Sequence, residues 1–174
     1  MTTQKFSIVV AIDEKRGIGK DNKIPWHIKE DLVNLKNLTQ NQVVIVGANT
    51  FISMQSYYDK SEREMPGKVY IVVTDDRGFN PSCSNAICVY SIDEAIKKAK
   101  SYGTDEVFII GGSQIFKQMI KLANKLYLTI VKGDFDCDTF FPGYSDFKNV
   151  ISSKREKNET NEFEFKILER ITKE

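Results

Sequence analysis

Short apolar runs bounded by turn residues alternate with stretches of helical period along the chain. Strands are predicted at Phe6–Ile12, Val43–Gly47, Lys68–Thr74, Ala86–Tyr90, Glu106–Ile110 and Lys125–Val131. Helices are predicted over Ile28–Leu38, around Thr50–Met54, from Ser91 onward and around Ile115–Ile120. This alternation of strand-sized apolar runs with helices indicates an α/β fold rather than a helix bundle or a β-sandwich.

Polar segments separate these elements. Ser91, with Glu94 three residues later, forms a capping box that marks a helix start. Gln55–Glu64 has no periodicity and is predicted to be a loop. Glu162–Ile167 alternates charged and apolar residues, as one strand of a C-terminal antiparallel hairpin does. Ser152–Glu162 is predicted to be either a long hairpin loop or a disordered segment.

Length and composition limit the class of protein. A chain of 174 residues is expected to form one domain, residues 1–174, around one core. The longest apolar runs, Val43–Val46 and Val107–Ile110, are far shorter than the roughly 20 residues that span a bilayer. Met1–Lys5 leads directly into a strand, without a cleavable apolar segment. We therefore expect a cytoplasmic protein with no membrane partner.

Charge, cysteine and histidine content exclude further classes. The net charge is +1 with both signs interspersed, so the chain offers no basic stripe for nucleic acid. Cys83, Cys88 and Cys137 match no zinc or redox spacing, and His27 is the only histidine, so no metal site is predicted. The cysteines are interpreted as free thiols in a reducing compartment. His27 is interpreted as capping or solvating the helix start rather than relaying a proton.

Asp31 is the most informative single residue. On a helical wheel Ile28, Leu32, Leu35 and Leu38 define one apolar stripe, and Asp31 falls on that same stripe. A carboxylate there is costly without a hydrogen-bond partner, and its pKa rises when it loses water. The pattern alone fits a buried framework carboxylate and a functional carboxylate equally well.

Two predicted strands end in glycine immediately before a helix. Gly47 precedes the helix that contains Thr50, and Gly111-Gly112 precedes the helix around Ile115. Bare backbone and helix N-termini at such turns can approach a pyrophosphate. The spacing is not a G-x-G-x-x-G fingerprint, and taken alone such turns more often have no ligand.

Together these segments resemble those of dihydrofolate reductases. Ile24-Pro25-Trp26 followed by Asp31 is similar to the signature of that family, with a glycine-containing lid loop, Gly17–Lys23, before it. Further similar segments follow in the family's order: VVIVGANTF (Val43–Phe51), MPGK (Met65–Lys68), VFIIGGSQIF (Val107–Phe116), KLYLT (Lys125–Thr129) and DTFFP (Asp138–Pro142). The resemblance covers nearly the whole chain. It implies a central mixed, mostly parallel sheet with a C-terminal antiparallel hairpin and about four flanking helices.

The resemblance also implies an activity and a set of site residues. The activity is NADPH-dependent reduction of 7,8-dihydrofolate to 5,6,7,8-tetrahydrofolate, with hydride transfer to C6 and protonation at N5, in support of one-carbon metabolism and thymidylate and purine synthesis. Asp31 would bind the 2-amino group and N3 of the pterin, Thr129 would support its carboxylate, and Trp26 would order a water; these are the implied catalytic residues. The implied substrate-binding residues are Val9, Val10, Ile12, Asp31, Leu32, Leu35, Met54, Lys68, Ile110 and Thr129, with Ile12, Leu32, Leu35, Met54 and Ile110 as apolar walls. The implied cofactor-binding residues are Ala11, Ile18, Gly19, Gly47, Ala48, Asn49, Thr50, Thr74, Asp75, Ile110, Gly111, Gly112, Ser113, Gln114, Ile115 and Phe116, with a cis peptide between Gly111 and Gly112.

Several positions depart from the family pattern. Lys68 stands where an arginine would fork onto the glutamate carboxylate of folate, and lysine cannot make that planar contact. Ala48 and Gln114 stand where basic residues often contact the 2′-phosphate of the cofactor. Asp75 would repel a phosphate, and Arg77 is available to compensate. NADPH is expected ahead of NADH.

Other functions stay open beside the leading one. A reductase of the same fold could act on another pterin, which Lys68 leaves open, or on a pyrimidine, against which Pro25-Trp26 and Asp31 argue. A catalytically inactive folate- or nucleotide-binding module is the third hypothesis, and the intact Asp31 and Thr129 argue against it. Like most simple members of such a family, the chain is expected to be a monomer with a small-molecule substrate.

Overall fold

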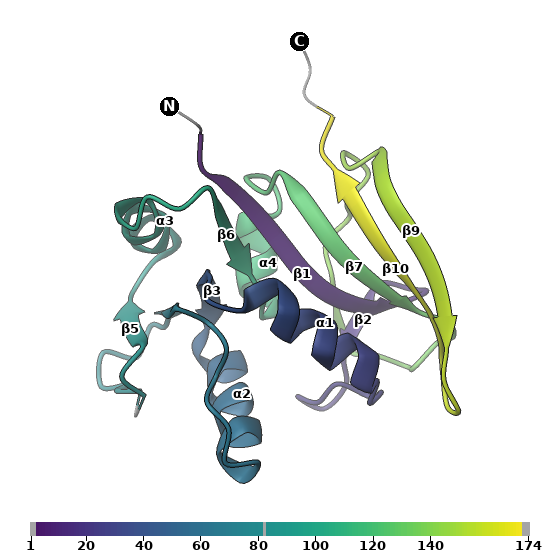
Figure 1. Ribbon diagram of the computed structural model, residues 1–174, viewed down its shortest axis with the longest axis horizontal. Coiled ribbons are helices and arrows are strands. Elements are labelled where there is room, and N and C mark those ends of the chain that lie inside the picture. Colours follow the sequence, from purple (N-terminus) through teal and green to yellow (C-terminus); the bar gives the residue numbers. More distant parts are fainter. Residues whose placement is uncertain (1–2, 82, 172–174) are drawn as a thin grey trace.

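An eight-stranded sheet forms the centre of the protein (Figure 1). The computed structural model describes residues 3–81 and 83–171. In spatial order the strands are β5 (Ala86–Val89), β4 (Val69–Val73), β3 (Val43–Gly47), β6 (Glu106–Ile109), β1 (Lys5–Asp13), β7 (Lys125–Val131), β10 (Glu162–Glu169) and β9 (Asn149–Lys157). The first six are parallel, and β10 and β9 form an antiparallel hairpin beside β7. The predicted α/β class and mixed sheet are confirmed.

Four helices cover the two faces of this sheet within the described residues. Helices α1 (Lys29–Thr39) and α2 (Ala48–Lys60) pack on one face, where Leu35 and Phe51 join a core cluster with Val44. Helices α3 (Ile92–Ser101) and α4 (Ser113–Met119) pack on the other face. Because side chains alternate along a strand, one strand feeds both core clusters: Val9 of β1 faces α1 and α2, while Ile8 faces α3 and α4.

The start of α3 follows the predicted capping box. The Glu94 backbone N–H donates to the Ser91 hydroxyl at 3.1 Å, and the Glu94 carboxylate accepts the Tyr90 N–H at 2.7 Å. The first bond satisfies a backbone donor that the first helical turn leaves free, and the second joins the residue before the N-cap to the helix. The predicted helix start is therefore confirmed.

Helix α2 is longer than predicted. Its last turns run through residues 55–60, which the sequence predicts as loop, and only residues 61–68 connect it to β4. Most side chains from 55 to 60 are exposed, because α2 extends beyond the carboxyl ends of the parallel strands (Figure 1). A helical segment without a buried face has no apolar stripe for sequence periodicity to detect.

The C-terminal hairpin also differs from its prediction. Strand β9 occupies most of the segment predicted as long loop or disorder, and a short turn at residues 158–161 joins it to β10. Strand β9 is the edge of the sheet, and all but one of its residues are exposed on both faces. Its polar sequence therefore lacks the alternation by which a half-buried strand is recognised.

A second, two-stranded sheet pairs β2 (Gly17–Gly19) with β8 (Thr139–Phe140). The sequence places Gly17 and Gly19 in a loop, and these strands are too short to show a pattern. Within the part of the chain that is described, no helix combines the length and the apolar character needed to cross a membrane.

Candidate active site

Asp31 and Thr129 meet on the face of the sheet that α1 covers. Asp31 lies in the first turn of α1, and the Thr129 hydroxyl of β7 donates to its Oδ1 at 2.6 Å. Thr129 is only 2% exposed and Asp31 is half-buried. Burial raises the pKa of Asp31, and the bond from Thr129 opposes part of that rise. The predicted contact and the predicted direction of the pKa shift are both present.

The residues before α1 fix its position. No side chain caps the helix at Ile28, so packing holds this end in place. Ile28 is 2% exposed and Trp26 is 8% exposed, and both belong to a cluster with Phe163 of β10. The ring of Phe135 meets Trp26 edge-on, with centroids 5.1 Å apart. His27 between them is exposed.

Glycines bring β3 and β6 together at their carboxyl ends. The peptide bond between Gly111 and Gly112 is cis, as the resemblance implies. The Gly47 N–H donates to the Gly111 carbonyl at 2.7 Å. A Cβ at Gly112 would lie 3.1 Å from the Thr50 hydroxyl, so side chains at this junction would crowd α2. Gly47 caps α2 without a side-chain bond, which leaves the first-turn N–H groups of α2 open to a ligand.

The remaining predicted cofactor residues lie along this same edge. Ala48, Asn49 and Thr50 begin α2, and Thr74 and Asp75 follow β4, the neighbour of β3. Ile115 and Phe116 are buried in the core cluster beneath α4, so their backbone rather than their side chains is available at this edge. The Arg77 guanidinium lies 4.4 Å from the centre of the Tyr90 ring, beyond the end of β4.

One predicted apolar wall is wrong. Ala11 pairs with Thr129 and faces α1, whereas its neighbour Ile12 pairs with Ile130. Ile12 is 1% exposed in the core cluster under α3 and α4, on the far side of the sheet from Asp31. Its side chain therefore cannot line the Asp31 side, and the same alternation turns the Val10 side chain away.

The other predicted walls lie on the correct face. Ile110 is buried in the cluster that Leu35 and Met54 join, and Leu32 is half-buried on α1. Lys68 is exposed just before β4. The fold thus brings Asp31, Thr129 and these apolar residues close to the glycine junction, which is formed by Gly47, Gly111 and Gly112 at the carboxyl ends of β3 and β6.

Sequence reasoning missed two residues near this site. Phe135 contacts Trp26, and Asp13, at the end of β1, is a buried carboxylate. A polar residue closing a buried strand is a signal that the sequence did contain for Asp13. The contact of Phe135 depends on a loop path that no local pattern specifies.

The fold and this geometry define an α/β protein with a half-buried carboxylate and a glycine junction at the carboxyl ends of a parallel sheet. The sequence model of dihydrofolate reductase matches residues 5–171, and the chain belongs to the dihydrofolate reductase family. It is 38% identical to a dihydrofolate reductase of Staphylococcus haemolyticus over 172 residues, which covers 96% of each chain. It is 33% identical to that of Bacillus subtilis (strain 168), covering 94% of this chain and 92% of the relative.

A solved structure agrees with this membership. Dihydrofolate reductase from Enterococcus faecalis, complexed with NADP(H) and RAB-propyl, superimposes with a TM-score of 0.81 at 26% identity. The match covers 95% of this chain and 96% of that one. The resemblance inferred from the sequence is confirmed.

Proposed function

We propose that this protein reduces 7,8-dihydrofolate to 5,6,7,8-tetrahydrofolate with NADPH. The observation that carries the proposal is the contact between the half-buried Asp31 and the buried Thr129, whose donor–acceptor distance is 2.6 Å. A pterin presents two neighbouring donors, the 2-amino group and N3, and the two oxygens of a carboxylate match them. Asp31 is the group on this face of the sheet that can accept both.

Asp31 has a second part in the reaction. The pterin N5 must gain a proton, and a negative charge in a site of low dielectric favours the protonated form. Thr129 holds one carboxylate oxygen, so the carboxylate keeps one orientation while the ring binds. Asp31 orients the ring and favours protonation, and a water ordered near Trp26 delivers the proton to N5. Residues 17–24 act as a lid that excludes bulk water.

The glycine junction fits NADPH. The first turn of α2 has no side-chain cap, and Gly111 and Gly112 present backbone without side chains, so a pyrophosphate can approach both. When bound, NADPH supplies the hydride. Ala11, Ile18 and Gly19 would surround its nicotinamide end, and Thr50 and residues 111–116 would hold the phosphates. Asp75 and Arg77 stand at the end of β4, where Arg77 offsets the carboxylate for a 2′-phosphate.

The domain organisation, oligomeric state and location of the protein are also part of the proposal. Residues 1–174 act as one reductase domain, a monomer in the cytoplasm that binds small molecules and no nucleic acid. Its product supports one-carbon transfer in thymidylate and purine synthesis.

The test is an absorbance assay of reduced nicotinamide with purified protein. NADPH and NADH are run in parallel with dihydrofolate and, separately, with a dihydropterin that lacks the glutamate tail. Rapid oxidation of NADPH with dihydrofolate is expected. Turnover only with the tail-less pterin would replace the substrate and would make Lys68 the residue to study. No turnover with either, from folded protein, would overturn the proposal.

A further inference from the structure

Asp13 is a buried carboxylate outside the pair formed by Asp31 and Thr129. It ends β1, is 1% exposed, and is the one charged residue among the buried polar side chains of the described chain. Its Oδ1 accepts the backbone N–H groups of Lys15 at 2.9 Å and Gly17 at 2.7 Å. Its Oδ2 accepts the N–H of Phe135 at 3.2 Å. Bonds from N–H groups to a carboxylate are stronger than neutral ones, so Asp13 firmly joins two loops distant in sequence.

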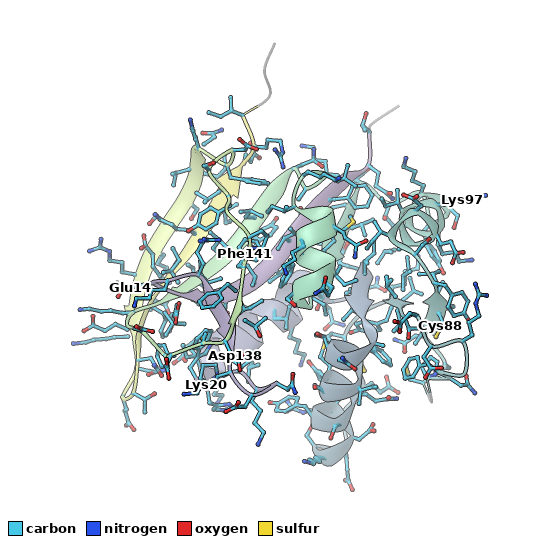
Figure 2. All side chains as sticks on the ribbon, turned by 180° about the vertical axis from the view of Figure 1, so that it is seen from behind. Glu14, Lys20, Cys88, Lys97, Asp138 and Phe141 are labelled. Carbon is cyan, nitrogen blue, oxygen red and sulfur yellow. The ribbon has the colours of Figure 1, made fainter. Side chains whose placement is uncertain are left out.

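The first of these loops is the start of the lid. Gly17 opens β2, and a Cβ placed on it would lie 2.5 Å from the Cys137 Cβ and 2.8 Å from Asp13 Oδ2. Farther along, the Asp138 N–H donates to the Gly19 carbonyl at 3.0 Å. Figure 2 shows Lys20 and Asp138 on the same side of the molecule, where the two segments run together. The two loop segments are therefore packed closely against each other around Asp13.

The second loop reaches the site through an aromatic contact. The N–H of Phe135 is fixed by Asp13, and its ring meets Trp26 edge-on at 5.1 Å. Trp26 lies before α1 and is 8% exposed. One carboxylate thus bonds both to the first residue of the lid and to the residue whose ring lies beside Trp26.

We propose that Asp13 is a positioning residue of the reductase. It acts through Gly17 on the lid and through Phe135 on Trp26, and this inference rests on the proposed function of those two elements. The alternative, that Asp13 only stabilises the fold, predicts a loss of stability with no specific change at Trp26 or in the hydride step.

The first experiment is Asp13→Asn, which keeps the shape of the side chain. One of its two oxygens becomes an amide that cannot accept an N–H bond, so either Phe135 or the turn at Gly17 loses its partner. Trp26 is the only tryptophan of the chain, so its fluorescence reports this site directly. We expect a red-shifted emission and stronger quenching by acrylamide. We also expect single-turnover hydride transfer to fall by about tenfold, as the loss of one charge-assisted bond predicts, with the KM for dihydrofolate within about twofold.

A matched control is Glu94→Gln on α3. This variant also alters a carboxylate that accepts a backbone N–H, from Tyr90 at 2.7 Å, but far from the lid in sequence and on the other face of the sheet. Its emission and hydride rate should equal those of the wild type. Phe135→Leu keeps the backbone N–H and removes the ring, so in combination with Asp13→Asn it should add less than the sum of the single effects.

The outcomes separate the two proposals. A wild-type protein without turnover contradicts the proposed function. The Trp26 emission of the Asp13→Asn variant still tests whether Asp13 positions Phe135 against Trp26. An active wild type whose Asp13→Asn variant keeps both the emission and the hydride rate overturns the inference. If Asp13→Asn does not fold, Phe135→Leu carries the test, and unchanged emission and rate in that variant overturn the inference equally.

Discussion

Replacing Asp31 with asparagine separates what this carboxylate does for catalysis from what it does for stability. The amide keeps the size of the side chain, and its oxygen can still accept the Thr129 hydroxyl, now 2.6 Å from Oδ1. Its nitrogen, however, donates where the pterin also donates. Asp31→Asn therefore loses the negative charge and one of the two acceptor oxygens, while the local packing is retained.

The expected loss of rate follows from the two donors of the pterin. A hydrogen bond to a charged group contributes about 1.5–3 kcal/mol, and about 1.4 kcal/mol corresponds to a factor of ten in rate. Asparagine loses one of the two bonds outright and turns the other from a charge-assisted bond into a neutral one, which weakens it by about 1 kcal/mol. Hydride transfer should therefore fall by roughly 10²- to 10³-fold.

The same substitution should increase the stability of the protein at neutral pH, although it lowers the rate. Burial raises the pKa of Asp31 above its unfolded value, with the Thr129 bond opposing part of the rise. The stability that is present below the unfolded pKa is therefore lost as the pH rises through the folded pKa. Asparagine does not ionise, so it does not lose stability as the pH rises. We expect Asp31→Asn to raise Tm at neutral pH, and the difference to disappear in acid.

Single-turnover kinetics and thermal unfolding across pH measure both effects on the same preparations. Glu30→Gln is the matched control, because Glu30 is the adjacent carboxylate of α1 and accepts a bond from Asn158 at 3.1 Å instead. That variant should keep the rate. A folded Asp31→Asn protein that keeps its rate within about tenfold would refute the assigned role of the carboxylate. A Tm that falls at neutral pH would refute the reasoning about its burial.

Three further predictions concern the same site. Thr129→Val removes the donor that lowers the pKa of Asp31, so the pKa should rise further, and a pH–rate profile that moves to lower pH would contradict this. Gly112→Ala places a Cβ 3.1 Å from the Thr50 hydroxyl, so the KM for NADPH should rise severalfold with little change for dihydrofolate, and steady-state kinetics with equal effects on both would count against the cofactor assignment. Arg77→Gln should raise the KM for NADPH more than that for NADH, and parallel titrations with an unchanged ratio would exclude Arg77 from 2′-phosphate recognition.

The sequence predicted best those elements whose side chains are buried on a regular period. Strands β3 and β7 have the predicted bounds, because an apolar run in a parallel sheet has few alternative structures. Asp31 could be recognised for the same reason. A carboxylate on the apolar stripe of a helix needs a hydrogen-bond partner, and the Thr129 hydroxyl is that partner.

Exposed or very short elements could not be predicted in this way. The end of α2 and the whole of β9 form few buried contacts, so their sequences carry no hydrophobic period. The error at Ile12 has a different cause. The resemblance implied Ile12 as an apolar wall, but neighbouring residues of a strand point to opposite faces, and Ile12 lies on the face opposite that of Ala11.

Strand β9 has a consequence for how the protein behaves when concentrated. The edge of a sheet carries backbone groups to which a strand from another chain can add, and this is a common route to aggregation. Three cations, Lys154, Arg155 and Lys157, lie along this exposed edge. These cations outnumber the one carboxylate of the strand, Glu156, which pairs with Lys154. The polar sequence that concealed β9 therefore also opposes the pairing of two copies at this edge.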